Sequence, residues 1–123
     1  MLLDTYAWVE YFNGTAKGET VRALLREKQC FTSAISLAEL SEWCARKGRE
    51  SGEILGAVKK TSIIIGLDND LLEAAGRISH GMKCTVKGFG MLDAIILATS
   101  RAYSLPVVTG DRHFAGEEGA VML

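Results

Sequence analysis

The sequence predicts an α/β fold, a three-layer α/β/α sandwich with a central parallel sheet of four to five strands. Short apolar segments that fit buried strands alternate along the chain with longer segments in which apolar residues recur every three or four positions. This alternation favours parallel strands joined by right-handed crossovers, with helices on both faces of the sheet. Because the 123 residues have the size of one domain and 48% of them are hydrophobic, we expect residues 1–123 to form a single domain with a substantial core.

Five segments are predicted strands because each is short, apolar and bounded by residues typical of turns. The first is so short that it must be central and buried, and it ends in Asp4. Three consecutive isoleucines mark the third as a buried strand. Pro106 cannot continue a helix but suits the first residue of the fourth strand, which Gly110 follows. The predicted strands are residues 1–5, 30–35, 62–67, 106–109 and 120–123.

Six further segments are predicted helices because their apolar residues form one face. Thr5 is placed to cap the first helix and Asp68 the fifth, and Ser36 opens the third. The core-facing residues of the fifth helix are Leu71, Leu72, Ala75 and Ile78, and those of the sixth are Leu92, Ile95, Ile96, Ala98, Thr99 and Ala102. The predicted helices are residues 6–13, 18–28, 36–48, 51–60, 70–80 and 91–104, and residues 81–90 form a glycine-rich loop over a cleft.

Composition excludes several classes of protein. The net charge is −1, so no global basic field attracts nucleic acid, and any polyanion has to be held by a local patch. The longest apolar run, about five residues, is far below the roughly 20 needed to cross a bilayer, and the chain starts with a strand-like run rather than a signal peptide. We therefore expect a cytoplasmic protein. Three cysteines without C-x-x-C spacing favour neither a disulfide framework nor a zinc knuckle.

Four carboxylates are expected to meet in the crevice beyond the carboxyl ends of the strands, where ligands bind in such folds. Asp4 follows the first strand, Glu39 lies one turn after the second, Asp93 lies in the first turn of the sixth helix, and Asp111 follows the fourth strand. Such a cluster repels itself and raises its own pKa values, and a divalent cation resolves this conflict. Oxygen ligands without imidazole or thiolate suit Mg²⁺ or Mn²⁺ better than zinc.

The chemistry of such a site is phosphodiester hydrolysis. A hard cation held by carboxylates lowers the pKa of a bound water and neutralises the charge that develops on a phosphate. The hydroxyls of Thr5 and Thr109 are placed to orient water molecules around the cation.

Each acid also has a local structural explanation. Ser36 and Glu39 fit the S-x-x-E capping box of a helix start. Asp93 in a first helical turn complements the helix dipole, and Asp111 is an ordinary turn residue. Asp4 is harder to explain in this way, because it follows a buried strand without a basic partner. One metal site is a more economical account than four separate structural roles.

Three segments carry a resemblance to a known family. They read LLDTYAWVEYF at the start, SAISLAEL in the second strand–helix unit, and MLDAIILATSRAYSLPVVTGDRHF late in the chain. Together they resemble the PIN domain, and specifically the VapC-type toxin ribonucleases of toxin–antitoxin pairs, over essentially the whole chain. By this resemblance, Thr109 is the supporting hydroxyl of a T-x-D element, and the metal-binding acidic quartet consists of Asp4, Glu39, Asp93 and Asp111.

The resemblance implies a Mg²⁺- or Mn²⁺-dependent endoribonuclease that cleaves RNA phosphodiester bonds with metal-activated water. It also implies a homodimer and a small cognate antitoxin that occupies the acidic cleft. One position departs from the pattern, since many relatives carry a further acid where this chain has His113. His113 is either a general base or a structural residue stacked on its neighbours. Whether one metal ion or two bind at once stays open.

Two other functions need residues that this chain lacks. A haloacid-dehalogenase-type phosphatase needs a second acid two residues after the first-strand aspartate, and this chain has Tyr6 there. A phosphoacceptor receiver domain needs an acidic pair near the first strand, which is missing. The alternative that stays open is a catalytically silent PIN-fold module that binds RNA or another protein.

Overall fold

A five-stranded parallel sheet forms the middle layer of the computed structural model, which describes all residues from Met1 to Leu123. The strand order is β3-β2-β1-β4-β5. The strands are β1 (Leu2–Leu3), β2 (Phe31–Ser33), β3 (Ile63–Ile65), β4 (Val107–Thr109) and β5 (Val121–Met122). The helices are α1 (Thr5–Asn13), α2 (Ala16–Glu27), α3 (Ala34–Lys47), α4 (Ser51–Thr61), α5 (Asn69–Lys83) and α6 (Met91–Tyr103), followed by a 3₁₀ turn, η1 (Arg112–Phe114).

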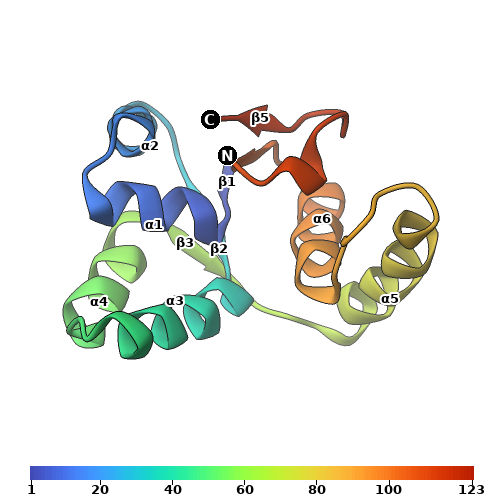
Figure 1. Ribbon diagram of the computed structural model, residues 1–123, viewed down its shortest axis with the longest axis horizontal. Helices are drawn as coiled ribbons and strands as arrows, with labels where there is room; N and C mark the ends of the chain where they lie inside the picture. The colour runs from blue at the N-terminus through green and yellow to red at the C-terminus, as the bar shows by residue number, and fades with distance from the viewer.

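The helices cover both faces of the sheet, which confirms the predicted three-layer α/β/α sandwich. In Figure 1, α1 to α4 lie on one side of the strands, and α5 and α6 lie on the other. The two side chains of β1 lie on opposite faces of the sheet, because successive side chains of a strand point in opposite directions. Leu2 packs into the core beneath α5 and α6, and Leu3 packs into the core beneath α1 to α4.

Strand β1 is central and buried, as its short apolar sequence predicts. It pairs with β2 on one side and with β4 on the other, and both of its leucines are fully buried. Burial of a leucine side chain stabilises the fold by roughly 1.5–3 kcal/mol. Two residues are enough to hold β1 in the sheet, because the residues that flank the strand also form backbone hydrogen bonds with its neighbours. The amide of Asp4 donates to the Val108 carbonyl over 3.3 Å.

The predicted boundary between the second strand and the third helix is wrong. The strand ends at Ser33, not at Ile35, because the Ser33 hydroxyl accepts a hydrogen bond from the Ile35 amide and caps α3. A side-chain cap of this kind ends the extended backbone and starts the helix. Ser36, which the sequence placed at the helix start, therefore lies inside α3 and is fully buried.

Several residues predicted to be buried are exposed. Strand β3 lies at the edge of the sheet, so Ile65 is buried but the side chain of Ile63 is 49% exposed. Leu72 in α5 and Leu92 in α6 were expected to face the core, and both are exposed. The Asp68 cap of α5 is confirmed, since its carboxylate accepts a 2.8 Å hydrogen bond from Leu71.

The glycine-rich loop is shorter than expected. Helix α5 continues to Lys83, so only residues 84–90 are irregular. Phe89 in this segment is buried at 2% exposure, and its ring centroid lies 6.1 Å from that of Phe114. This aromatic contact attaches the loop to the turn that follows β4.

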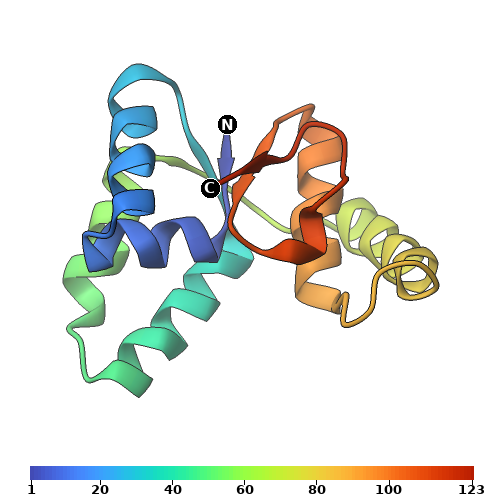
Figure 2. The same ribbon diagram turned by 45° about the horizontal axis from the view of Figure 1, so that its top comes forward.

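The two ends of the chain lie close together (Figures 1 and 2), because β1 and β5 both flank β4. No helix combines the length and the apolar character that a membrane crossing requires.

Candidate active site

The four predicted acids line one small cavity at the carboxyl ends of the strands. Strands β2, β1 and β4 are neighbours, so the residues that follow them meet at the same edge of the sheet. The cavity has a volume of about 90 Å³, and no lysine or arginine is among its lining residues. It is lined by Asp4, Thr5, Tyr6, Glu39, Leu92, Asp93, Ile96, Asp111 and Phe114.

Asp4 is held at the cavity by the start of α1. Its Oδ1 accepts a 2.9 Å hydrogen bond from the Ala7 amide, so Asp4 is the N-cap of the helix. The prediction that Thr5 is the cap is therefore wrong. Only 6% of Asp4 is exposed, and this burial raises its pKa to about 7. Hydrogen bonds from Thr109 and Ala7 lower the pKa, while the charges of Asp111 and Glu39 raise it.

The Thr5 hydroxyl binds Glu39 instead of the helix backbone. It donates to Glu39 Oε1 over 2.7 Å, and Ser36 Oγ lies 3.0 Å from the same hydroxyl oxygen. Ser36 and Glu39 do not form a capping box, because Ser33 caps α3 and Ser36 lies inside the helix. Burial raises the pKa of Glu39, the Thr5 hydroxyl opposes this shift, and the negative charge of Asp93 adds to it.

Asp93 has both a local role and a place in the cavity. It is the third residue of α6, and its Oδ2 accepts a 3.1 Å hydrogen bond from the Gly90 amide at the helix start. The same oxygen lies 2.9 Å from Nδ1 of His113. The prediction that the Asp93 carboxylate complements the start of the helix is confirmed, because the carboxylate accepts a hydrogen bond there. This contact leaves the carboxylate facing the cavity.

Asp111 is positioned by the turn after β4. Its amide donates a 2.9 Å hydrogen bond to the buried Thr109 hydroxyl, and its own Oδ1 accepts one of 2.9 Å from the His113 amide. Gly110 lies between Thr109 and Asp111, and a larger residue does not fit there, because a Cβ would lie 2.1 Å from Cε1 of Tyr6. The Thr109 hydroxyl thus supports the Asp111 backbone.

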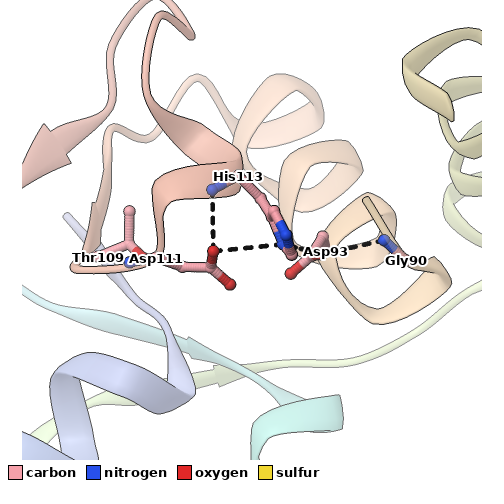
Figure 3. Close-up of polar contacts among 5 residues, drawn as sticks. All are labelled: Gly90, Asp93, Thr109, Asp111 and His113. Carbon is pink, nitrogen blue, oxygen red and sulfur yellow. Dashed lines mark hydrogen bonds and ion pairs between the residues drawn. The ribbon is translucent and has the colours of Figure 1, made fainter. Parts of the chain in front are cut away.

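His113 joins this arrangement, although the sequence offered it as a departure from the family pattern and as either a general base or a stacked structural residue, not as part of the metal site. Its Nδ1 lies between the carboxylates of Asp93 and Asp111, 3.3 Å from Oδ1 of the latter (Figure 3). The three residues offer ligand atoms that all lie within 4.8 Å of one another. Asp4 and Glu39 line the same cavity but lie outside this tight group. The available sequence signal was the position of His113, two residues after Asp111.

The side chains of the site fit a divalent cation. Four carboxylates face one cavity without a basic lining residue, and mutual repulsion contributes to the raised pKa of Asp4 and Glu39. Hard oxygen donors in this number suit Mg²⁺ and Mn²⁺. A cation at this position would offset the repulsion that adds to the effect of burial on the two pKa values.

Solved structures match nearly the whole chain. One is a toxin–antitoxin complex from Klebsiella pneumoniae, in which the matching chain is 26% identical with a TM-score of 0.79, covering 98% of this chain and 95% of that one. A second is FitAcB from Neisseria gonorrhoeae, at 26% identity and a TM-score of 0.71, covering 99% and 96%. A third is VapC20 of Mycobacterium tuberculosis, described as a Sarcin-Ricin loop cleaving toxin, at 21% identity and a TM-score of 0.72, covering 99% and 97%.

The match to VapC20 shows a shared fold alone at that level of identity. No curated protein matches the chain significantly. The PIN domain family model matches residues 1–116, which is nearly the full sequence and includes all four acids of the cavity. On this match, and on a fold and an acidic cavity that agree with it, the chain belongs to the PIN domain family.

Proposed function

We propose that the chain is a Mg²⁺- or Mn²⁺-dependent endoribonuclease, the toxin of a VapBC-type toxin–antitoxin pair, and that it cleaves RNA phosphodiester bonds in the cytoplasm. The observation that carries the proposal is that carboxylates from four separate segments line one small cavity. PIN family membership and a structural relative solved in a toxin–antitoxin complex support it. In this proposal residues 1–123 form one nuclease domain.

Asp4, Asp93 and Asp111 are the residues we assign to the main cation. When bound, such a cation lowers the pKa of a water molecule and neutralises charge on a phosphate. The protein holds these carboxylates in place with the Ala7, Gly90 and His113 amides. Because each carboxylate is oriented by a backbone N–H group, little reorganisation is needed on binding.

Glu39 completes a second site or relays a proton. Its raised pKa favours the second role, because a carboxyl that ionises closer to neutral pH exchanges protons more effectively with water. The Thr5 hydroxyl holds its Oε1, which leaves the other carboxylate oxygen for the reaction. An RNA phosphate would be repelled by four carboxylates alone, so the proposal requires the cation for substrate binding as well as for chemistry.

The test is cleavage of structured RNA by wild type and Asp93→Asn, in Mn²⁺ and in EDTA. Asparagine keeps an oxygen for the Gly90 amide, so the helix start is retained. We expect cleavage to fall by roughly 100-fold or more, since loss of even an outer-shell partner costs 10- to 100-fold. Asp70→Asn is the matched control, because Asp70 is an exposed acid in the first turn of α5.

Two outcomes would contradict the mechanism. One is equal cleavage by wild type and Asp93→Asn, and the other is wild-type cleavage that survives EDTA. If wild type cleaves no RNA under any of these conditions, the catalytically silent binding module becomes the better account.

A groove beside the acidic cavity fits a protein partner. It has a volume of about 430 Å³ and shares Thr5, Glu39 and Leu92 with the cavity. Its other lining residues are Val9, Ile35, Ala38, Glu42, Trp43 and Arg46. We assign the groove and the acidic cleft to a cognate antitoxin, as expected from the relative solved in a toxin–antitoxin complex.

This assignment is tested by co-purification with the product of any short reading frame that adjoins the gene. Ala38 is exposed and lines the groove, whereas Ala45 is exposed on the same helix outside it. We expect Ala38→Arg to abolish co-purification and Ala45→Arg to retain it. Equal retention by both variants would exclude this groove as the binding surface.

The proposed homodimer is supported by exposed apolar side chains on α5 and α6 outside that groove, namely Leu72, Met91 and Tyr103. Light scattering coupled to size exclusion tests it directly. A monomer mass at every concentration up to tens of micromolar would contradict the dimer.

A further inference from the structure

His113 occupies the position of a third ligand in the tight group at the cavity. Its Nδ1 lies 2.9 Å from Asp93 Oδ2 and 3.3 Å from Asp111 Oδ1, and Figure 3 shows the imidazole between the two carboxylates. Ligand atoms about 2.1 Å from an octahedral ion stand about 3.0 Å apart along each edge of the octahedron. The distances from Nδ1 to the two carboxylate oxygens therefore fit two edges of one coordination octahedron, with Nδ1 at the corner that the edges share.

The orientation of the ring is set by contacts on its other side. The His113 amide is bound by Asp111 Oδ1, which fixes the backbone at the start of η1. Phe89 lies against the ring, with the two centroids 6.3 Å apart. Nε2 faces Gly88, where a Cβ would approach to 3.1 Å. Gly88 has φ of +81°, so glycine suits this position both for its backbone and for the space that it leaves.

This orientation determines which nitrogen is available to the site. With the ring proton on Nε2, the lone pair of Nδ1 is free on the side of the two carboxylates. The carboxylate of Asp93 is held by the Gly90 amide, and that of Asp111 by the His113 amide. The two carboxylates are thus positioned by backbone N–H groups that do not depend on a cation.

We infer that Nδ1 of His113 is a metal ligand beside Asp93 and Asp111, and that this nitrogen makes the site prefer Mn²⁺ to Mg²⁺. The inference rests on the proposed metal-dependent nuclease and specifies its cation. An imidazole nitrogen is a softer donor than a carboxylate oxygen, so it raises the affinity of a site for transition ions relative to Mg²⁺, and Mn²⁺ is the transition ion that gains least from it. Sequence patterns alone had indicated a site made only of oxygen donors.

The opposing interpretation is that Nδ1 carries the proton and donates a hydrogen bond to Asp93. The distances are compatible with that bond too. In that case the nitrogen does not contact the cation, and His113 only orients the carboxylate. The two interpretations differ in one observable, the presence of an imidazole nitrogen in the coordination sphere of bound Mn²⁺.

Pulsed electron paramagnetic resonance of the Mn²⁺-loaded protein measures this directly. We expect nitrogen modulation from an imidazole in wild type, and its replacement by the nitrogen-15 pattern when the histidines are isotopically labelled. The chain has two histidines, and His80 is exposed on α5, so His80→Gln is the matched control and should keep the signal. His113→Asp should lose the signal and still bind Mn²⁺ through an oxygen.

Calorimetric titration of the same proteins gives the second readout. In wild type and His80→Gln we expect Mn²⁺ to bind more tightly than Mg²⁺, and in His113→Asp the ratio of the two dissociation constants should fall by roughly tenfold. Bound Mn²⁺ without imidazole modulation in wild type would overturn the inference and leave the metal-dependent nuclease intact. Absence of any Mn²⁺ binding by wild type would overturn both.

Discussion

The Asp4 side chain is subject to two opposing effects. As the N-cap of α1 it accepts the Ala7 N–H, which favours the charged carboxylate. Burial removes its hydration and raises its pKa to about 7, against an ordinary value of 3.8. Because the folded protein binds a proton that the unfolded chain releases between these values, the stability of the metal-free protein depends on pH in that window.

The metal-free protein is expected to lose stability as the pH rises from about 4 to about 7. In this window the folded state holds more protons, so Asp4 alone lowers the free energy of unfolding by at most about 1.4 kcal/mol per pH unit. Asp4→Asn keeps an oxygen for Ala7 and should reduce the slope. Urea unfolding in EDTA across this range provides the measurement.

The matched control is Asp68→Asn, which changes the exposed cap of α5 in the same way and should leave the slope unchanged. The raised pKa of Glu39 acts in the same direction as that of Asp4, so some dependence should remain in Asp4→Asn. Wild-type stability that rises with pH in EDTA would contradict the assignment.

At the residue scale, the sequence located the acids but not their neighbours. Asp4 and Asp111 could be placed because each directly follows a strand, and strand ends meet at one edge of a parallel sheet. The position of His113 depends on Asp93, which lies 20 residues earlier, and on a loop that sets the orientation of its ring. Contacts over that separation have no local sequence signal.

At the scale of elements, α1 and α2 approach each other closely at Gly18. A Cβ at this position would lie 2.1 Å from the backbone oxygen of Glu10. Backbone cannot move away as a flexible side chain can, so the glycine allows the two helices to pack. Gly56 in α4 is also inside a helix, but nothing lies within 4 Å of its added Cβ.

The two glycines should therefore respond to alanine with opposite signs. Gly18→Ala should destabilise the protein by about 2 kcal/mol, because overpacking forces the helices apart. Gly56→Ala should stabilise it by roughly 0.5–1 kcal/mol through better helix propensity. Chemical unfolding of both variants at one pH is the measurement, and equal effects of the same sign would show that the packing of α1 on α2 does not restrict Gly18.

The sequence predicted the type of each helix and strand better than its first and last residues. Every predicted strand and helix has a counterpart, because alternation and periodicity report on burial over many residues. The second strand was extended too far, since the Ser33 cap decides its end and Ser36 offered a competing signal. Exposure of Ile63 and Leu92 depends on which strand lies at the edge and which helix face lies near the cavity, and neither is a property of the local sequence.

At the scale of the whole molecule, the layers followed from the sequence, but the strand order did not. The order β3-β2-β1-β4-β5 places β4 beside β1, although more than 100 residues separate them. That pairing brings Asp111 next to Asp4 and joins the two halves of the chain at the acidic cavity. The residues proposed to hold the cation therefore come from both ends of the chain.

A cation bound by such distant segments should stabilise the whole fold, because the unfolded chain does not hold these carboxylates together. At a Mn²⁺ concentration 100 times the dissociation constant, the gain is about 2.7 kcal/mol, and for a domain of this size the melting temperature should rise by roughly 10 °C. The rise should be absent in the double variant Asp93→Asn with Asp111→Asn and retained in the control Asp68→Asn with Asp70→Asn. Thermal unfolding monitored by circular dichroism, with and without Mn²⁺, gives both values.

The melting temperature in EDTA separates loss of the site from damage to the fold. Removal of two charges from a cavity that already contains Asp4 and Glu39 relieves repulsion, so the metal-free double variant should melt at or above the wild-type temperature. If the two substitutions damaged the fold, the double variant would melt at a lower temperature than wild type in EDTA. If other residues held the ion, the melting temperature of the double variant would still rise with Mn²⁺. A wild-type melting temperature that does not change with Mn²⁺ would show that the acidic cavity does not hold the cation in the folded protein.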